Sequence, residues 1–244
     1  MKEFLGIGGY KRTAEGFLSW QHILFVSIFA VAMIALAIVL GKRNKNKTLK
    51  EKCRVLLYTA FVLDGIEICK IVFLCFRESN PLHWVNCLPL FLCSIQMITI
   101  PIAAVSKGRI KEACLDFIAV FGLIGGLLGT YCAGNNFNSY PVLSLENVVS
   151  AITHSTIGFA SLYVLIAKMA TMKKKNLPIS FAILLSFCVA AYIANVLFSC
   201  NYMFLMRGDG TPYDIVYKLV NGNPVLYPLT VVLLFVVYIL LFTF

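Results

Sequence analysis

The chain has 244 residues, of which 60% are hydrophobic and only 13% are charged. Soluble domains carry roughly a quarter charged residues, so this composition excludes an ordinary soluble protein and indicates one embedded in lipid. The formal net charge is +10, but the Lys and Arg residues gather in short links between apolar runs. That pattern orients membrane proteins, so we expect membrane lipids, and no nucleic acid, as partners.

Seven apolar runs reach or approach the roughly 20 residues that a spanning helix needs. They predict an all-α fold, a polytopic transmembrane helical bundle that forms a single transmembrane domain over residues 1–244. We expect a multi-pass protein of the cell membrane. The predicted helices cover, in chain order, residues 22–40, 55–76, 87–105, 113–132, 148–169, 179–200 and 225–244.

The distribution of positive charge predicts the orientation of this bundle. Of the 21 Lys and Arg residues, most lie in or beside the links that follow the first, third and fifth predicted helices. Cytoplasmic loops carry an excess of Lys and Arg, so these links are expected in the cytoplasm. The N-terminus is then outside and the C-terminus inside, with Trp20 and Trp84 at the outer interface, where tryptophan is enriched.

Three ionisable residues interrupt the second predicted helix. Asp64, Glu67 and Lys70 follow one another at intervals of three and so share one drifting face. A charge at the bilayer centre costs about 2.5–3.5 kcal/mol on insertion scales, and such residues usually face the bundle interior. A Glu67–Lys70 ion pair that only locks the bundle is one interpretation, and a functional site is the other.

Further polar residues fall in the same outer layer of the membrane. At 1.5 Å per residue, Glu67, Cys93 and His154 lie roughly 9 to 14 Å below the outer ends of their predicted helices. Histidine can take a thiol proton, the thiolate can attack an acyl carbon, and a carboxylate can orient the imidazole. We therefore predict Cys93, His154, Glu67 and Asp64 as catalytic residues.

Other residues near this layer complete the predicted site. Thr153 and Ser155 are alternative nucleophiles, although they neighbour His154 on one helix. We expect polar side chains in this layer or at its mouth to bind substrate. They are His22, Lys70, Gln96, Asn195, Asn201 and Tyr202.

No cofactor or metal is expected from the residue pattern. The nine cysteines form no CxxC pair, and the three histidines lack the i, i+4 spacing of a zinc-binding helix. The last predicted helix contains no lysine for a retinal Schiff base.

The stretch Leu88-Pro89-Leu90-Phe91-Leu92-Cys93-Ser94 resembles the LPLxLCS signature of the bacterial YwaF-type seven-helix integral membrane proteins. Further stretches look like that family in the same order along most of the chain. They are residues 19–22, Glu67, Gly125-Gly126, His154 with residues 161–163, and residues 201–205.

The YwaF-type family is remotely similar to a eukaryotic transmembrane acyltransferase that remodels ether phospholipids through a cysteine centre. It is more remotely similar to androgen-induced-type lipid hydrolases. The resemblance implies acyl chemistry on a lipid, with His154 as general base. There is one departure: the acyltransferase has its reactive cysteine nearer the proline and followed by histidine, where this chain has Leu90-Phe91.

The residues leave three functions open. The first is an acyltransferase or hydrolase that acts on lipid acyl groups in an outward-facing intramembrane pocket. The second is a non-catalytic transporter, or a binder of a small solute or lipid, because intramembrane carboxylates also suit proton coupling. The third is an assembly partner that packs through the glycine-rich fourth helix. Neither the substrate nor the oligomeric state follows from the sequence.

Overall fold

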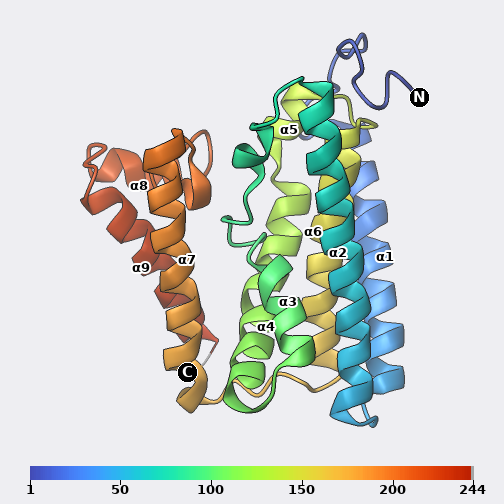
Figure 1. Ribbon diagram of the computed structural model, residues 1–244, viewed down its shortest axis with the longest axis vertical. Helices are drawn as coiled ribbons and strands as arrows, with labels where there is room; N and C mark the ends of the chain where they lie inside the picture. The colour runs from blue at the N-terminus through green and yellow to red at the C-terminus, as the bar shows by residue number, and fades with distance from the viewer. Residues whose placement is uncertain (243–244) are drawn as a thin grey trace.

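The computed structural model describes residues 1–242 and is built from helices, with no strand among those residues. Figure 1 shows a bundle whose long helices lie along one axis. The α-helices are α1 (Trp20–Asn44), α2 (Leu49–Arg77), α3 (Gln96–Val105), α4 (Gly108–Tyr131), α5 (Gly134–Ser139), α6 (Leu145–Ile166), α7 (Leu177–Phe198), α8 (Tyr213–Leu219) and α9 (Leu226–Leu241). The predicted all-α bundle is confirmed.

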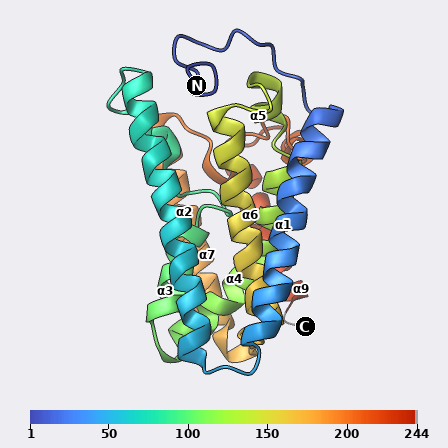
Figure 2. The ribbon, with the colours of Figure 1, turned by 90° about the vertical axis from the view of Figure 1, so that its right-hand side faces the viewer.

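The chain runs up and down along the bundle axis. The N-terminus and the end of α9 lie at opposite ends (Figure 1). The links between α1 and α2, between α3 and α4, and between α6 and α7 all lie at the end away from the N-terminus (Figures 1 and 2). These are the three basic links, so the positive charge gathers at one end of the molecule. Which side of a membrane that end faces stays a prediction.

Side-chain caps define where several of the long helices begin. The Ser19 hydroxyl accepts the backbone N–H of His22 at the start of α1. Thr48 and Glu51 form a reciprocal capping box at the start of α2. Such caps satisfy backbone donors that have no partner within the helix.

Four helical stretches of the described chain are long and apolar enough to cross a membrane. They are Trp20–Asn44, Gly108–Ser139, Leu145–Ile166 and Lys174–Phe198. The outer faces of α1 and α7 carry exposed apolar side chains such as Val31 (66%) and Leu197 (68%), which suit contact with lipid. Helix α2 has 29 residues, but Asp64, Glu67 and Lys70 interrupt its apolar run. Helices α3 and α9 are apolar and shorter.

The prediction of a helix over residues 87–105 is wrong for its first half. A short 3-10 turn, His83–Cys87, is followed by an irregular segment, residues 88–95, and only Gln96–Val105 is α-helical. Proline disfavours helical backbone in the residue before it, and Leu88 is extended, with φ −59° and ψ 145°. Pro89 therefore keeps the helix from starting at the predicted position.

Helices α4 and α6 form the centre of the bundle, and α6 also packs along α1 and α2. A Cβ atom on Gly126 would lie 2.6 Å from the Cα of Gly158 and 3.1 Å from the carbonyl oxygen of His154. The two backbones therefore touch. The hydroxyl of Ser161 on α6 also donates to the carbonyl of Ala119 on α4 at 2.8 Å, so hydrogen bonding reinforces the contact.

We expect Gly126→Ala to destabilise the protein by about 1–3 kcal/mol, because the added methyl meets backbone and forces α4 and α6 apart. Gly65→Ala is the matched control, since a Cβ there meets nothing within 4 Å. It is expected to be neutral or slightly stabilising. Thermal unfolding in detergent measures both. Equal melting temperatures for the two variants would contradict the close contact.

Candidate functional site

One face of α4 carries glycines that make room for the predicted nucleophile and base. A Cβ on Gly125 would lie 3.2 Å from the Cβ of Cys93. A Cβ on Gly129 would overlap the imidazole ring of His154 and lie 2.6 Å from its Cγ. Residues four apart share one helix face. Cys93 and His154 therefore lie against successive turns of α4, roughly 6 Å apart along its axis.

Helix α2 brings a carboxylate to the same place. Glu67 interacts electrostatically with both the Cys93 thiol and the His154 imidazole. Its side chain also pairs with Lys70 at 2.5 Å, so the ion pair that the spacing allowed does form. Glu67 and Lys70 thus lie on a helix that packs against α3 and α6, and no hydrogen bond in the described chain joins them to Cys93 or His154.

The polar atoms at this site are largely unused by the fold. The Nδ1 atom of His154 is buried and has no hydrogen-bond partner among residues 1–242. The Cys93 thiol lies 3.9 Å from the hydroxyl of Ser94. Asp64, three residues before Glu67 on α2, has a buried carboxylate oxygen that likewise finds no partner in the described chain. Buried polar groups are usually hydrogen-bonded, so the unpartnered atoms of His154 and Asp64 are available to bind a ligand or to take part in catalysis.

The two alternative nucleophiles, Thr153 and Ser155, differ in whether their hydroxyl groups have a hydrogen-bond partner. Thr153 donates its hydroxyl to the carbonyl of Ser150 on its own helix at 3.1 Å. The Ser155 hydroxyl is buried and has no partner within the described residues. Both flank His154 on α6, and successive helix residues point in different directions.

Two of the predicted substrate-binding residues are wholly buried. Gln96 accepts the Thr99 hydroxyl at 3.0 Å, and its amide nitrogen has no partner in residues 1–242. His22 lies at the start of α1, where its Nδ1 accepts the Leu18 N–H at 3.1 Å and its ring packs on Phe137 of α5 with centroids 4.0 Å apart. His22 therefore belongs to the packing at the end of the bundle.

Of the other four, Lys70 pairs with Glu67 as described above, and Asn195, Asn201 and Tyr202 act as tethers. Asn195 brackets the backbone of Tyr202, donating to its carbonyl at 3.0 Å and accepting its N–H at 2.6 Å. The Tyr202 hydroxyl donates to the carbonyl of Val85 and accepts the N–H of Leu88 at 3.0 Å. Asn201 binds the carbonyl of Arg207 and the carboxylate of Asp209. These contacts hold the start of the irregular segment that carries Cys93.

The sequence analysis did not single out a half-buried polar cluster at the N-terminal end of the bundle. Arg77 at the end of α2 pairs with Glu146 of α6 at 2.6 Å and donates to the carbonyl of Leu5 at 3.1 Å. Tyr10 donates its hydroxyl to Glu146. Burial, together with that hydrogen bond, raises the pKa of Tyr10 to about 12. The phenol therefore stays protonated, and the cluster fastens the N-terminal segment across α2 and α6.

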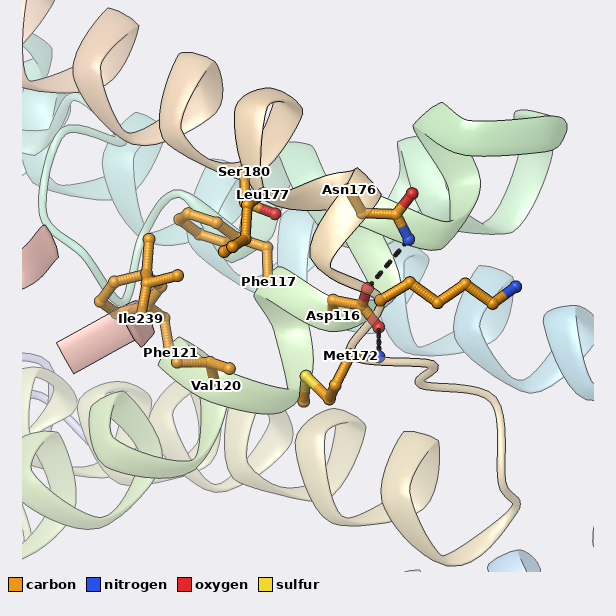
Figure 3. A pocket seen from close by; sticks show the side chains of 10 residues that line it. Asp116, Phe117, Val120, Phe121, Met172, Asn176, Leu177, Ser180 and Ile239 are labelled. Atoms are coloured by element: carbon orange, nitrogen blue, oxygen red, sulfur yellow. Dashed lines mark hydrogen bonds between the residues drawn. The ribbon is translucent and has the colours of Figure 1, made fainter. Parts of the chain in front are cut away.

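The sequence analysis also did not single out Asp116, a charged residue within the apolar helix α4. It lines a small cavity at the opposite end of the bundle, between α4, the α6–α7 link and α9 (Figure 3). Its carboxylate accepts the backbone N–H groups of Thr171 and Met172 at 2.7 and 2.9 Å, and the amide of Asn176 at 3.2 Å. With these partners Asp116 anchors the link.

Apolar helices around a polar intramembrane cluster define a helical membrane protein. The chain belongs to the TMEM164 family, a transmembrane family whose model matches residues 17–243. A comparison with curated proteins gives no match, and neither does one with solved structures. The expected membership of a transmembrane family is confirmed. The resemblance to YwaF-type proteins, and through them to an acyltransferase, stays a prediction.

We expect Tyr202→Phe to loosen the segment that carries Cys93. The change leaves the N–H of Leu88 without its partner, which costs about 1–3 kcal/mol where the group is buried. Hydrogen exchange over residues 85–95 should become faster, and Cys93 should react faster with a small maleimide. Tyr192→Phe on the exposed face of α7 is the control. Unchanged exchange in Tyr202→Phe would show that the tether is dispensable.

Proposed function

We propose that the protein is a membrane-embedded enzyme that transfers or hydrolyses lipid acyl groups, with Cys93 as nucleophile and His154 as general base. The observation that carries the proposal is their placement on successive turns of one glycine face of α4, with Glu67 on the neighbouring helix α2. A thiol, an imidazole and a carboxylate from separate segments are the set that acyl transfer through a covalent intermediate needs.

The proposed reaction has two balanced steps. His154 takes the Cys93 proton as the sulfur attacks the ester carbonyl of a lipid, and the C–O bond breaks to release an alcohol that receives the proton from His154. The acyl group is then held as a thioester. An acceptor hydroxyl, or water, gives its proton to His154 and attacks the thioester carbonyl. The C–S bond breaks, and His154 returns the proton to the sulfur, which restores the thiol.

The packing around the site supports roles for its other members. The absence of a side chain at Gly129 makes room for the His154 ring against α4. The ammonium group of Lys70 pairs with Glu67, so the carboxylate is not an isolated charge within the bundle.

A second candidate function rests on Asp64. Its buried oxygen without a partner in residues 1–242, next to the Glu67–Lys70 pair, is the arrangement that proton-coupled transporters use. Under that reading the site would bind and release a solute, and lipid composition would not depend on Cys93.

Acyl transfer can be measured with the purified full chain in nanodiscs. The donor is a phospholipid with a fluorescent acyl chain, and the acceptor is a lysophospholipid. We expect Cys93→Ala to fall to background, and His154→Gln to lose about 10²- to 10⁴-fold, the usual contribution of a general base. Cys69→Ala, at an exposed position of α2, should retain full activity.

Folding is checked by gel filtration and thermal unfolding of each variant. Folded Cys93→Ala and His154→Gln proteins that still transfer acyl chains would overturn the catalytic assignment. Solute uptake that depends on Glu67 and Asp64, with no acyl transfer by the wild type, would favour the transporter instead.

A further inference from the structure

An open cavity of about 240 Å³ lies where α1 turns into α2, at the basic end of the bundle. The turn lies at the foot of the α1 and α2 ribbons in Figure 2. Side chains from both helices and from the turn line it. They are Leu40, Arg43, Asn44, Lys47, Glu51, Arg54 and Val55.

The lining has an excess of positive charge. Arg43, Lys47 and Arg54 are cationic, and Glu51 is the only acid among the lining residues. The Glu51 carboxylate is already used by the capping box, where it accepts the Thr48 N–H at 3.0 Å and the Thr48 hydroxyl at 2.7 Å. The cavity therefore offers two guanidinium groups and an ammonium group to an anion. Guanidinium groups match phosphate oxygens in a two-pronged geometry.

The apolar part of the lining places the cavity at the level of lipid headgroups. Leu40 and Val55 are the residues at which the first predicted span ends and the second begins. On the neighbouring surface of α1, Leu36 and Val39 are exposed, at 50% and 62%. An anionic group in the cavity would thus have apolar surface beside it, where acyl chains lie. Basic pockets between spanning helices on the cytoplasmic side bind anionic headgroups in this way.

The frame of the cavity is fixed by buried hydrogen bonds. The Asn44 amide donates to the Tyr163 hydroxyl at 3.2 Å, and that hydroxyl donates to the carbonyl of Lys52 at 3.2 Å. The Lys52 ammonium donates to the carbonyl of Ala167, just past α6, at 2.7 Å. These bonds tie the end of α1 and the start of α2 to α6. A pre-organised frame reduces the entropy lost when a ligand binds.

We propose that this cavity binds the phosphate of an anionic phospholipid in the leaflet that faces the basic end of the bundle. Arg43 and Arg54 hold the phosphate from α1 and α2, and Lys47 closes over it from the turn. The site is separate from Cys93 and His154, so the proposal does not rest on acyl chemistry. If the basic residues of this link served only to orient the protein in the membrane, three of them would not need to line one cavity.

The same link supplies a matched control. Lys45 and Lys50 are exposed and do not line the cavity, so Lys45→Gln with Lys50→Gln removes as much charge as Arg43→Gln with Arg54→Gln. Each double variant of the full chain, in a neutral detergent, is titrated with short-chain phosphatidylglycerol. Bound lipid is counted by native mass spectrometry. Phosphatidylcholine of the same chain length tests the need for net negative charge, and inorganic phosphate is the competitor.

We expect the arginine double variant to bind phosphatidylglycerol about tenfold more weakly or worse, and the lysine double variant to stay within about twofold of the wild type. Lys47→Gln, in the turn itself, provides a second reading if the arginine variant does not fold, and should weaken binding severalfold. Equal weakening by both double variants would overturn the proposal in favour of diffuse attraction. Equal binding of phosphatidylcholine, or displacement of the lipid by phosphate at matched concentration, would also overturn it.

Discussion

The backbones of α4 and α6 touch at Gly126 and Gly158, and most of the bundle is arranged around that contact. Lipid tails are as apolar as leucine, so helices in a bilayer associate through close packing and hydrogen bonds rather than through the hydrophobic effect. Glycine lets the backbones meet, and the Ser161–Ala119 hydrogen bond adds a polar contact. With α6 fixed on α4, α1 and α2 pack on the remaining faces of α6.

The candidate site follows from the same packing. The α4 face that touches Gly158 continues into the glycines that lie against Cys93 and His154. An irregular backbone segment beside such a site needs partners for its polar groups, since none are available from lipid. Tyr202 supplies one of them at Leu88 and also binds the carbonyl of Val85 in the preceding turn, and Asn195 fixes the backbone of Tyr202. The position of Cys93 therefore depends on a loop that lies far along the chain.

The two ends of the bundle are held by different chemistry. At the N-terminal end, Arg77 and Glu146 pair across α2 and α6, and Tyr10 adds a hydrogen bond. At the other end, Lys52 and Asp116 bind backbone groups just beyond α6. Each of these charged side chains is kept away from lipid by a partner from another element, as buried charges require.

The sequence by itself determined the helical class and the position of most long helices, because apolar runs are local. The i, i+3 spacing also allowed the Glu67–Lys70 ion pair that the structure shows. The sequence also singled out Cys93, His154 and Glu67, since polar groups at membrane depth are costly. Only the tertiary structure decided how the start of residues 88–95 is held, that Asn195 and Tyr202 are tethers, and that Asp116 anchors a link. Those outcomes depend on partners such as Tyr202 and Leu88, which are 114 positions apart. Local secondary-structure propensity does not predict a hydrogen bond that forms only after distant segments have packed together.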